Sequence, residues 1–257
     1  MTVAGIPNDF RRAPMAATTL DDESRQAAIV EWTHRMADEL VASRLFAGLL
    51  PQMMRAGVDA GFQAAAAEAV VDELRHARLC AAVVETLGGE VHPPVLGFED
   101  VPRHDDVGSL EALLRNVISI CCLEETAAVA LLENDHRLAR ESTLRRVIAE
   151  ILDDEIRHSR LGWRMLQSLA PRIDGPMRKR LGAYLVPAFA RLFDRHLTSS
   201  EAPGAQTVSA KVLFVEVVNE VIVPRLEAFD LPAREAVEAA LALPDPADDV
   251  VVWAATD

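Results

Sequence analysis

The chain has 257 residues and a formal net charge of −14; half of its residues are hydrophobic and 5% are aromatic. This length fits a single domain, and the apolar fraction is sufficient for a sizeable core. The strong negative charge argues against nucleic acids and anionic membranes as partners.

The cysteines and the N-terminal segment indicate the compartment. Cys80, Cys121 and Cys122 form no C-x-x-C pair, which fits a reducing compartment better than a disulfide framework. We interpret them as small buried hydrophobic side chains. The segment MTVAGIPNDFRRAPMAA lacks the apolar region of a signal peptide, and no apolar run is long enough to span a membrane. We therefore expect a cytoplasmic protein with no membrane partner.

The sequence predicts helices throughout the chain. Residues 1–20 are expected to form an irregular arm, followed by helices over 21–56 and 62–87, the second ending at Gly88 and Gly89. A long loop then leads to two further helices. Ser109 is predicted to cap a helix over 110–138, and Ser142 one over 143–169.

The last third, residues 171–257, is predicted to form a helical extension and an acidic tail. Helices are expected over 176–198, 208–228 and 232–242. The middle segment is rich in β-branched residues, so a strand is an alternative, but its apolar spacing favours a helix. These helices either cover one end of the preceding helices or form a homodimer surface; the sequence leaves both open.

Two similar motifs are the most informative feature of the chain. DELRHARL spans Asp72–Leu79, and DEIRHSRL spans Asp154–Leu161. Each contains Glu-x-x-His, whose two side chains share one face of a helix. Two such pairs, with one glutamate from each of two other helices, form the dinuclear carboxylate site of a four-helix bundle. A single Glu-x-x-His would predict only surface residues; the repeat favours a metal site.

Hairpin geometry selects the other two carboxylates. Glu39 and Glu73 are equidistant from Ala56, in a turn-like segment. Glu31 would instead place the turn at residue 52, inside an apolar stretch, so Glu39 is preferred.

In the second hairpin, the spacing does not distinguish two neighbouring glutamates. Glu125 and Glu155 are equidistant from Arg140, just before the expected start of the next helix, and Glu124 fits almost as well. Burial of both Glu124 and Glu125 is not expected, because an unpaired buried carboxylate is costly.

The D-E-x-R-H motifs resemble those of the ferritin-like di-iron carboxylate superfamily, especially the hydroxylase subunits of bacterial multicomponent monooxygenases. ELVASRLFAGL, ELRHARLC, CCLEETAAVALLE and DDEIRHSRLGWRML are similar to a group of small bacterial ferritin-like proteins. This resemblance covers about residues 25–170. It implies an all-α fold: a ferritin-like four-helix bundle over 21–170, with the long loop as its single crossover and with additional C-terminal helices.

The resemblance also implies roles for individual residues. The third carboxylate would be the glutamate directly before a threonine, here Glu125. The implied metal ligands are Glu39, Glu73, His76, Glu125, Glu155 and His158.

The resemblance implies that the aspartate of each motif supports the histidine of the other. Asp72 would accept a hydrogen bond from His158, and Asp154 from His76, each through Nδ1, which leaves Nε2 for metal. Arg75 and Arg157 are expected to form ion pairs with the buried aspartates and so offset their negative charge.

This ligand set suits two divalent ions of intermediate hardness, so we expect two iron ions, with manganese as the alternative. The resemblance implies a di-iron oxygenase or oxidase whose partners are dioxygen, a small organic substrate and an external electron donor. The alternative is a ferroxidase or peroxide-scavenging iron protein, and a metal-free helical interaction module comes third. The absence of paired C-x-x-C motifs argues against a rubrerythrin-type peroxidase. The position of the only tyrosine, Tyr184, argues against a tyrosyl radical enzyme.

Small residues around the expected site allow two interpretations. They either leave room for an organic substrate or let the helices pack tightly, and the sequence does not decide between these; the residues are Ala77, Cys80, Ala128 and Gly162.

Overall fold

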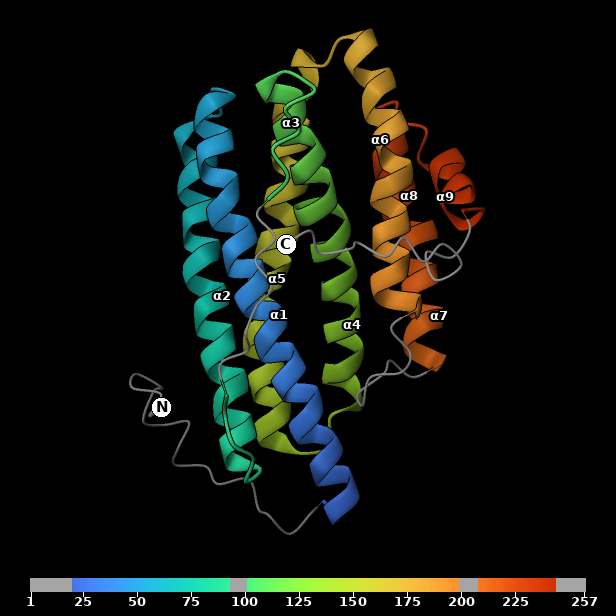
Figure 1. Ribbon diagram of the computed structural model, residues 1–257. Coiled ribbons are helices and arrows are strands. Elements are labelled where there is room, and N and C mark those ends of the chain that lie inside the picture. Colours follow the sequence, from blue (N-terminus) through green and yellow to red (C-terminus); the bar gives the residue numbers. More distant parts are fainter. Residues whose placement is uncertain (1–19, 93–100, 199–207, 244–257) are drawn as a thin grey trace, which may run out of the picture.

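The computed structural model describes residues 20–92, 101–198 and 208–243, and within these ranges the chain is helical with no strand. Four long helical stretches lie side by side (Figure 1). The first two are α1 (Asp22–Arg55) and α2 (Ala60–Thr86). The third is one continuous helical stretch that consists of α3 (Ser109–Asn116), the π-helical segment Val117–Glu124 and α4 (Glu125–Leu138). The fourth is α5 (Ser142–Leu169). None of the described helices is long and apolar enough to cross a lipid bilayer. The all-α prediction is confirmed.

Two tight hairpins and one long connection join these stretches. Short turns connect α1 to α2 and α4 to α5, whereas α2 and α3 are separated by a long connection, since α2 ends at the opposite end of the molecule from the start of α3 (Figure 1). Gly57 and Gly88 follow the ends of α1 and α2 with φ values of 65° and 83°. These values lie in the left-handed region that glycine adopts most readily. The predicted end of the second helix at Gly88 is therefore confirmed.

Helix N-termini are capped by carboxylates rather than by the two serines proposed from the sequence. The side chain of Asp21 accepts from the Ser24 N–H at the start of α1. At the start of α5, Glu141 accepts from the Leu144 N–H at 2.8 Å, so Ser142 is already the first helical residue. The Ser142 prediction was wrong because a longer carboxylate one residue earlier reaches the same N–H.

The other predicted serine cap was also wrong. Gly108 occupies the N-cap position of α3, and no side chain caps that helix. Ser109 is the first helical residue, and its hydroxyl donates instead to the Arg55 carbonyl at 3.5 Å.

The apolar core of the four stretches is divided into two clusters by a polar layer. On α1, Met36 belongs to one cluster and Phe46 to the other. On α5, Ile151 and Leu161 are separated in the same way. The segments between these pairs hold the buried acidic and histidine residues, so the polar layer crosses the bundle at one level.

The C-terminal helices cover a flank and not an end. They are α6 (Gly175–Phe193), α7 (Val208–Val217), α8 (Val223–Glu227) and α9 (Ala233–Leu241), with short π-helical segments after α6 and α7. α6 packs on α3 and α7 on α4, on the side away from α2 (Figure 1). The helical interpretation of 208–228 is confirmed, and the idea that the extension covers one end of the bundle was wrong. The predicted arm and acidic tail lie largely outside the described residues.

Close approach of α5 to the π-helical segment explains one of the small residues. A Cβ at Gly162 would lie 2.4 Å from the Cβ of Cys121 and 2.7 Å from its carbonyl carbon. Gly162 therefore serves helix packing, and it leaves no free space for a substrate at this point.

Gly162→Ala should lower the free energy of unfolding by about 1–3 kcal/mol, because the new methyl group meets backbone atoms that cannot easily move. This loss is expected although alanine normally favours a helix over glycine by roughly 1 kcal/mol. Urea unfolding followed by circular dichroism measures it. Gly175→Ala, at the start of α6 where an added Cβ meets nothing within 4 Å, is the matched control and should not destabilise. Equal stability of both variants would contradict the close packing.

Candidate metal centre

Six predicted side chains meet in the polar layer, at least one from each of the four long stretches. α1 contributes a glutamate, α2 a glutamate and a histidine, α4 a glutamate, and α5 a glutamate and a histidine. They are Glu39, Glu73, His76, Glu125, Glu155 and His158, all at most 8% exposed. They form two overlapping groups whose possible ligand atoms lie within 4.8 Å of one another, and both groups contain Glu73 and Glu155. Such groups could hold metal ions.

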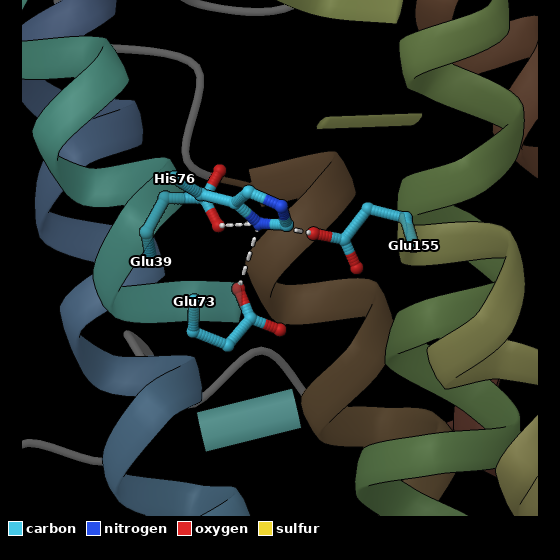
Figure 2. Close-up of side chains that lie close together, drawn as sticks. All are labelled: Glu39, Glu73, His76 and Glu155. Carbon is cyan, nitrogen blue, oxygen red and sulfur yellow. Dashed lines mark hydrogen bonds and ion pairs between the residues drawn. The ribbon is translucent and has the colours of Figure 1, made fainter. Parts of the chain in front are cut away.

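The first group surrounds one nitrogen of His76. Carboxylate oxygens of Glu39, Glu73 and Glu155 lie 3.4, 3.3 and 3.2 Å from His76 Nδ1. Figure 2 shows the three carboxylates converging on this atom from three helices. An imidazole nitrogen carries at most one hydrogen. Three acceptors at nearly equal distances therefore exceed what one N–H can satisfy.

The second group repeats this arrangement around His158. Glu73 Oε1 and Glu155 Oε2 lie 3.0 and 3.2 Å from His158 Nδ1. The other oxygen of each carboxylate, Glu73 Oε2 and Glu155 Oε1, faces His76. Both carboxylates thus divide their oxygens between the two histidines, as bridging ligands of a cation pair do.

The six side chains fit a pair of cations by two criteria, an available lone pair and the spacing of the possible ligand atoms. Glu73 Oε1 is buried and accepts no hydrogen bond from any described group, so its lone pairs are available. For ligands about 2.1 Å from an octahedral cation, adjacent ligand atoms lie about 3.0 Å apart. The observed separations around the two Nδ1 atoms, 3.0–3.4 Å, are close to this value.

The structure separates the two adjacent glutamates that spacing did not distinguish. Glu125 enters the second group and is 6% exposed. Glu124 points elsewhere: its Oε2 accepts a hydrogen bond from His196 Nε2 at 3.0 Å, and Arg195 lies 3.9 Å from its Oε1. Glu31, the other rejected candidate, pairs with Arg35 outside the cluster.

A π-helical segment immediately before Glu125 was not foreseen. Val117–Glu124 has π-helical hydrogen bonding within an otherwise α-helical stretch. Such segments are rare and occur mostly at functional sites. The sequence offers no clear signal for it, since VISICCLE is compatible with an ordinary buried helix.

The cross-bundle aspartate–histidine pairs are present, but through the opposite ring nitrogen. His76 Nε2 lies 3.0 Å from Asp154 Oδ2, and His158 Nε2 lies 3.5 Å from Asp72 Oδ2. The prediction that Nδ1 would face aspartate was wrong. Nδ1 of each histidine faces the clustered glutamates, including the one three residues earlier on its own helix, so Nε2 is the nitrogen left to face the aspartate.

Both predicted arginines form ion pairs that offset the negative charge of these aspartates. Arg75 and Arg157 each form an ion pair with Asp154. Arg157 also lies 3.1 Å from Asp72. Asp154 is 4% exposed, so its charge needs these partners more than that of the half-buried Asp72 does.

Without a metal, protons neutralise part of the cluster. Burial raises the pKa of Glu39 to about 8 and holds the pKa of Glu125 well above its usual range. Burial alone would lower the pKa of His158, but the carboxylates of Glu155 and Glu73 raise it to about 10. The pKa of His76 is likewise raised by Glu155, Glu39 and Glu73 against the effect of burial. Glu39 and His158 therefore hold an added proton at neutral pH, and the pKa shifts of Glu125 and His76 are in the same direction.

The surroundings of the cluster are apolar and tightly packed. The Phe46 ring lies 5.2 Å from the His158 ring, centroid to centroid. The three cysteines are free and buried, as predicted. An open pocket of about 760 Å³ lies between α1, α3 and residues 101–107, and none of the six side chains lines it.

A hydroxyl and indole network beside the cluster was also missed. Thr126 and Ser159, which directly follow Glu125 and His158, lie 3.0 Å apart through their hydroxyls. The indole of Trp163 donates to Thr126 Oγ1 at 3.0 Å. No residue spacing in the sequence would reveal this contact between α4 and α5.

Comparison of this chain with protein-family models, curated proteins and solved structures finds no match.

We expect Glu125→Gln to remove most metal loading and Glu124→Gln to leave it unchanged. The two residues are adjacent, but only Glu125 joins the cluster. Metal content after loading, measured by mass spectrometry of the purified variants, tests this. Equal loss in both variants would contradict the assignment.

We expect Asp154→Ala to weaken metal binding by roughly 10–100-fold, the usual effect of losing a carboxylate behind a metal-bound histidine. Asp72→Ala should have a smaller effect, because its contact with histidine is longer and more exposed. Asp153→Ala, at an exposed neighbouring position, is the control. Competition with a metal indicator gives the affinities. An Asp153 variant as weak as the Asp154 variant would rule out the proposed support.

Metal binding should release protons, because Glu39, Glu125, His76 and His158 must lose theirs to coordinate an ion. The apparent affinity should therefore rise with pH up to at least about pH 8, the pKa of Glu39, and continue to rise toward the pKa of His158. Calorimetry at one pH, in buffers with different ionisation enthalpies, counts the protons released. A binding enthalpy that does not depend on the buffer would contradict the protonated state of the free cluster.

Proposed function

We propose that this protein is a ferritin-like dinuclear metal enzyme that activates dioxygen to oxidise a small organic substrate. The observation that carries the proposal is the division of the Glu73 and Glu155 oxygens between His76 and His158. Two antiparallel hairpins with one long connection and a ligand from every long stretch agree with that bundle type.

Each residue would have a distinct task. Glu73 and Glu155 would bridge the two ions. Glu39 and His76 would complete one side of the centre. Glu125 and His158 would complete the other side. Iron is favoured over magnesium or calcium because two imidazoles join the carboxylates, and manganese fits the same donors. A pair of reduced iron ions supplies two electrons for the reduction of dioxygen.

The surrounding residues would keep the reaction away from water. Phe46 covers His158, and Cys80 lies fully buried on the helix that carries His76. A dry site strengthens the electrostatic attraction between ions and carboxylates and suppresses side reactions.

One observation favours a second candidate, a ferroxidase or peroxide-scavenging iron protein. The pocket between α1 and α3 does not reach the cluster, and Cys121 occupies the space beside Gly162. Iron, dioxygen and peroxide need less space than an organic substrate. The same six ligands would serve this chemistry.

The test begins with metal content and then follows iron oxidation. After expression with iron, mass spectrometry should find about two irons per chain, as the two-metal template requires. When dioxygen is added to the Fe(II)-loaded protein with excess Fe(II), an oxygenase should oxidise its two resident ions once and then stop until it is reduced. Continued oxidation of the added Fe(II) would instead favour the ferroxidase, and an absence of bound transition metal would exclude both.

A further inference from the structure

An apolar face of α2 remains uncovered. Val71 and Leu74 are 66% and 41% exposed, and they continue a row of exposed alanines at heptad spacing. We define the α2 face as Ala60, Ala64, Ala67, Val71 and Leu74. Spacings of four and three residues place these side chains in one narrow row along the helix, as in a coiled-coil seam.

This face points away from the packed interior. The buried residues of α2, including Ala69, Glu73 and His76, lie on the opposite side of the helix. α2 lies at the outer edge of the molecule, while α6 to α9 lie beyond α4 (Figure 1). Large exposed apolar residues arranged in a row, rather than scattered singly, mark interaction surfaces.

Charged residues beside the α2 face indicate its partner. Arg78, four residues after Leu74, continues the row, and Glu68 lies at its side; both are exposed, and in the described part of the chain neither forms an ion pair. In an antiparallel pairing of two α2 helices with Val71 against Leu74 of a second copy, Glu68 lies beside Arg78 of that copy. The two-fold axis repeats this ion pair. A parallel, in-register pairing would place Arg78 of the row against Arg78 of the second copy, which is repulsive.

We propose that the α2 face is the interface of a homodimer in which two copies of α2 pack antiparallel. The alanines allow close approach of the helix backbones, and Val71 with Leu74 forms the apolar centre. A 27-residue helix is about 40 Å long, which provides an extended contact. Standard interfaces bury about 1,200–2,000 Å² in total, so the edges of α1 and α5 beside α2 would join the rim.

The proposal is independent of the metal centre. Glu73 and His76 lie on the other face of α2, and the residues that would contact the second copy include no proposed ligand. Disruption of the dimer should therefore leave metal content unchanged, so failure of one proposal is distinguishable from failure of the other.

Sedimentation velocity of the full chain over a range of concentrations tests the dimer. The protein should dimerise, and Val71→Glu should raise the dimer dissociation constant at least about tenfold, since it places like charges in an apolar centre. Leu138→Glu, at an equally exposed apolar position on α4, is the matched control and should dimerise normally. Circular dichroism checks that both variants fold.

Charge reversal tests the antiparallel register. Glu68→Arg alone and Arg78→Glu alone should each weaken the dimer, and the double variant should restore it, because the ion pair is re-formed with its signs exchanged. A wild-type monomer at every concentration would overturn the proposal, as would a dimer insensitive to Val71→Glu. A double variant no better than the single ones would overturn the antiparallel pairing.

Discussion

Burial of four carboxylates at one level of an apolar bundle is the constraint on which the rest of the structure depends. An unpaired charge in such a place costs several kcal/mol. The two histidines neutralise part of the negative charge, and the raised pKa values of Glu39 and Glu125 show that protons neutralise more. Because protons and metal ions compete for the same lone pairs, the layer that destabilises the empty bundle is also what would give it affinity for cations.

The helices are arranged so that every ligand reaches this level. The apolar clusters on either side of the polar layer hold the helices together, and close contact between Gly162 and Cys121 brings α5 against the stretch that carries Glu125. The π-helical segment ends at Glu124, directly before Glu125. Consecutive side chains on a helix point about 100° apart, so Glu125 enters the cluster while Glu124 faces His196.

Periodicity and spacing along the chain predicted the helices, the hairpins, the two Glu-x-x-His pairs and Glu39, whereas only the resemblance favoured Glu125 over Glu124. Details that depend on contacts between helices were less accessible. The ring nitrogen that faces each aspartate depends on which nitrogen the glutamates of the other helices surround, and the Thr126–Trp163 contact follows from the packing of α4 on α5. The position of the C-terminal helices was equally hidden, since an amphipathic helix does not identify the surface it covers.

The repeated motif does not produce two equivalent halves. Asp154 is buried and contacts His76 at 3.0 Å, whereas Asp72 is half-buried and lies 3.5 Å from His158. Both arginines pair with both aspartates, but their contacts with Asp154 are the shorter ones. Three carboxylates lie within 3.4 Å of His76 Nδ1, whereas those of Glu73 and Glu155 lie within 3.2 Å of His158 Nδ1. A carboxylate behind a histidine increases its basicity as a ligand, and more so where solvent is excluded. The half of the centre around His76 is therefore the more strongly preorganised, and two ions bound here would be held unequally even though their ligand types are the same.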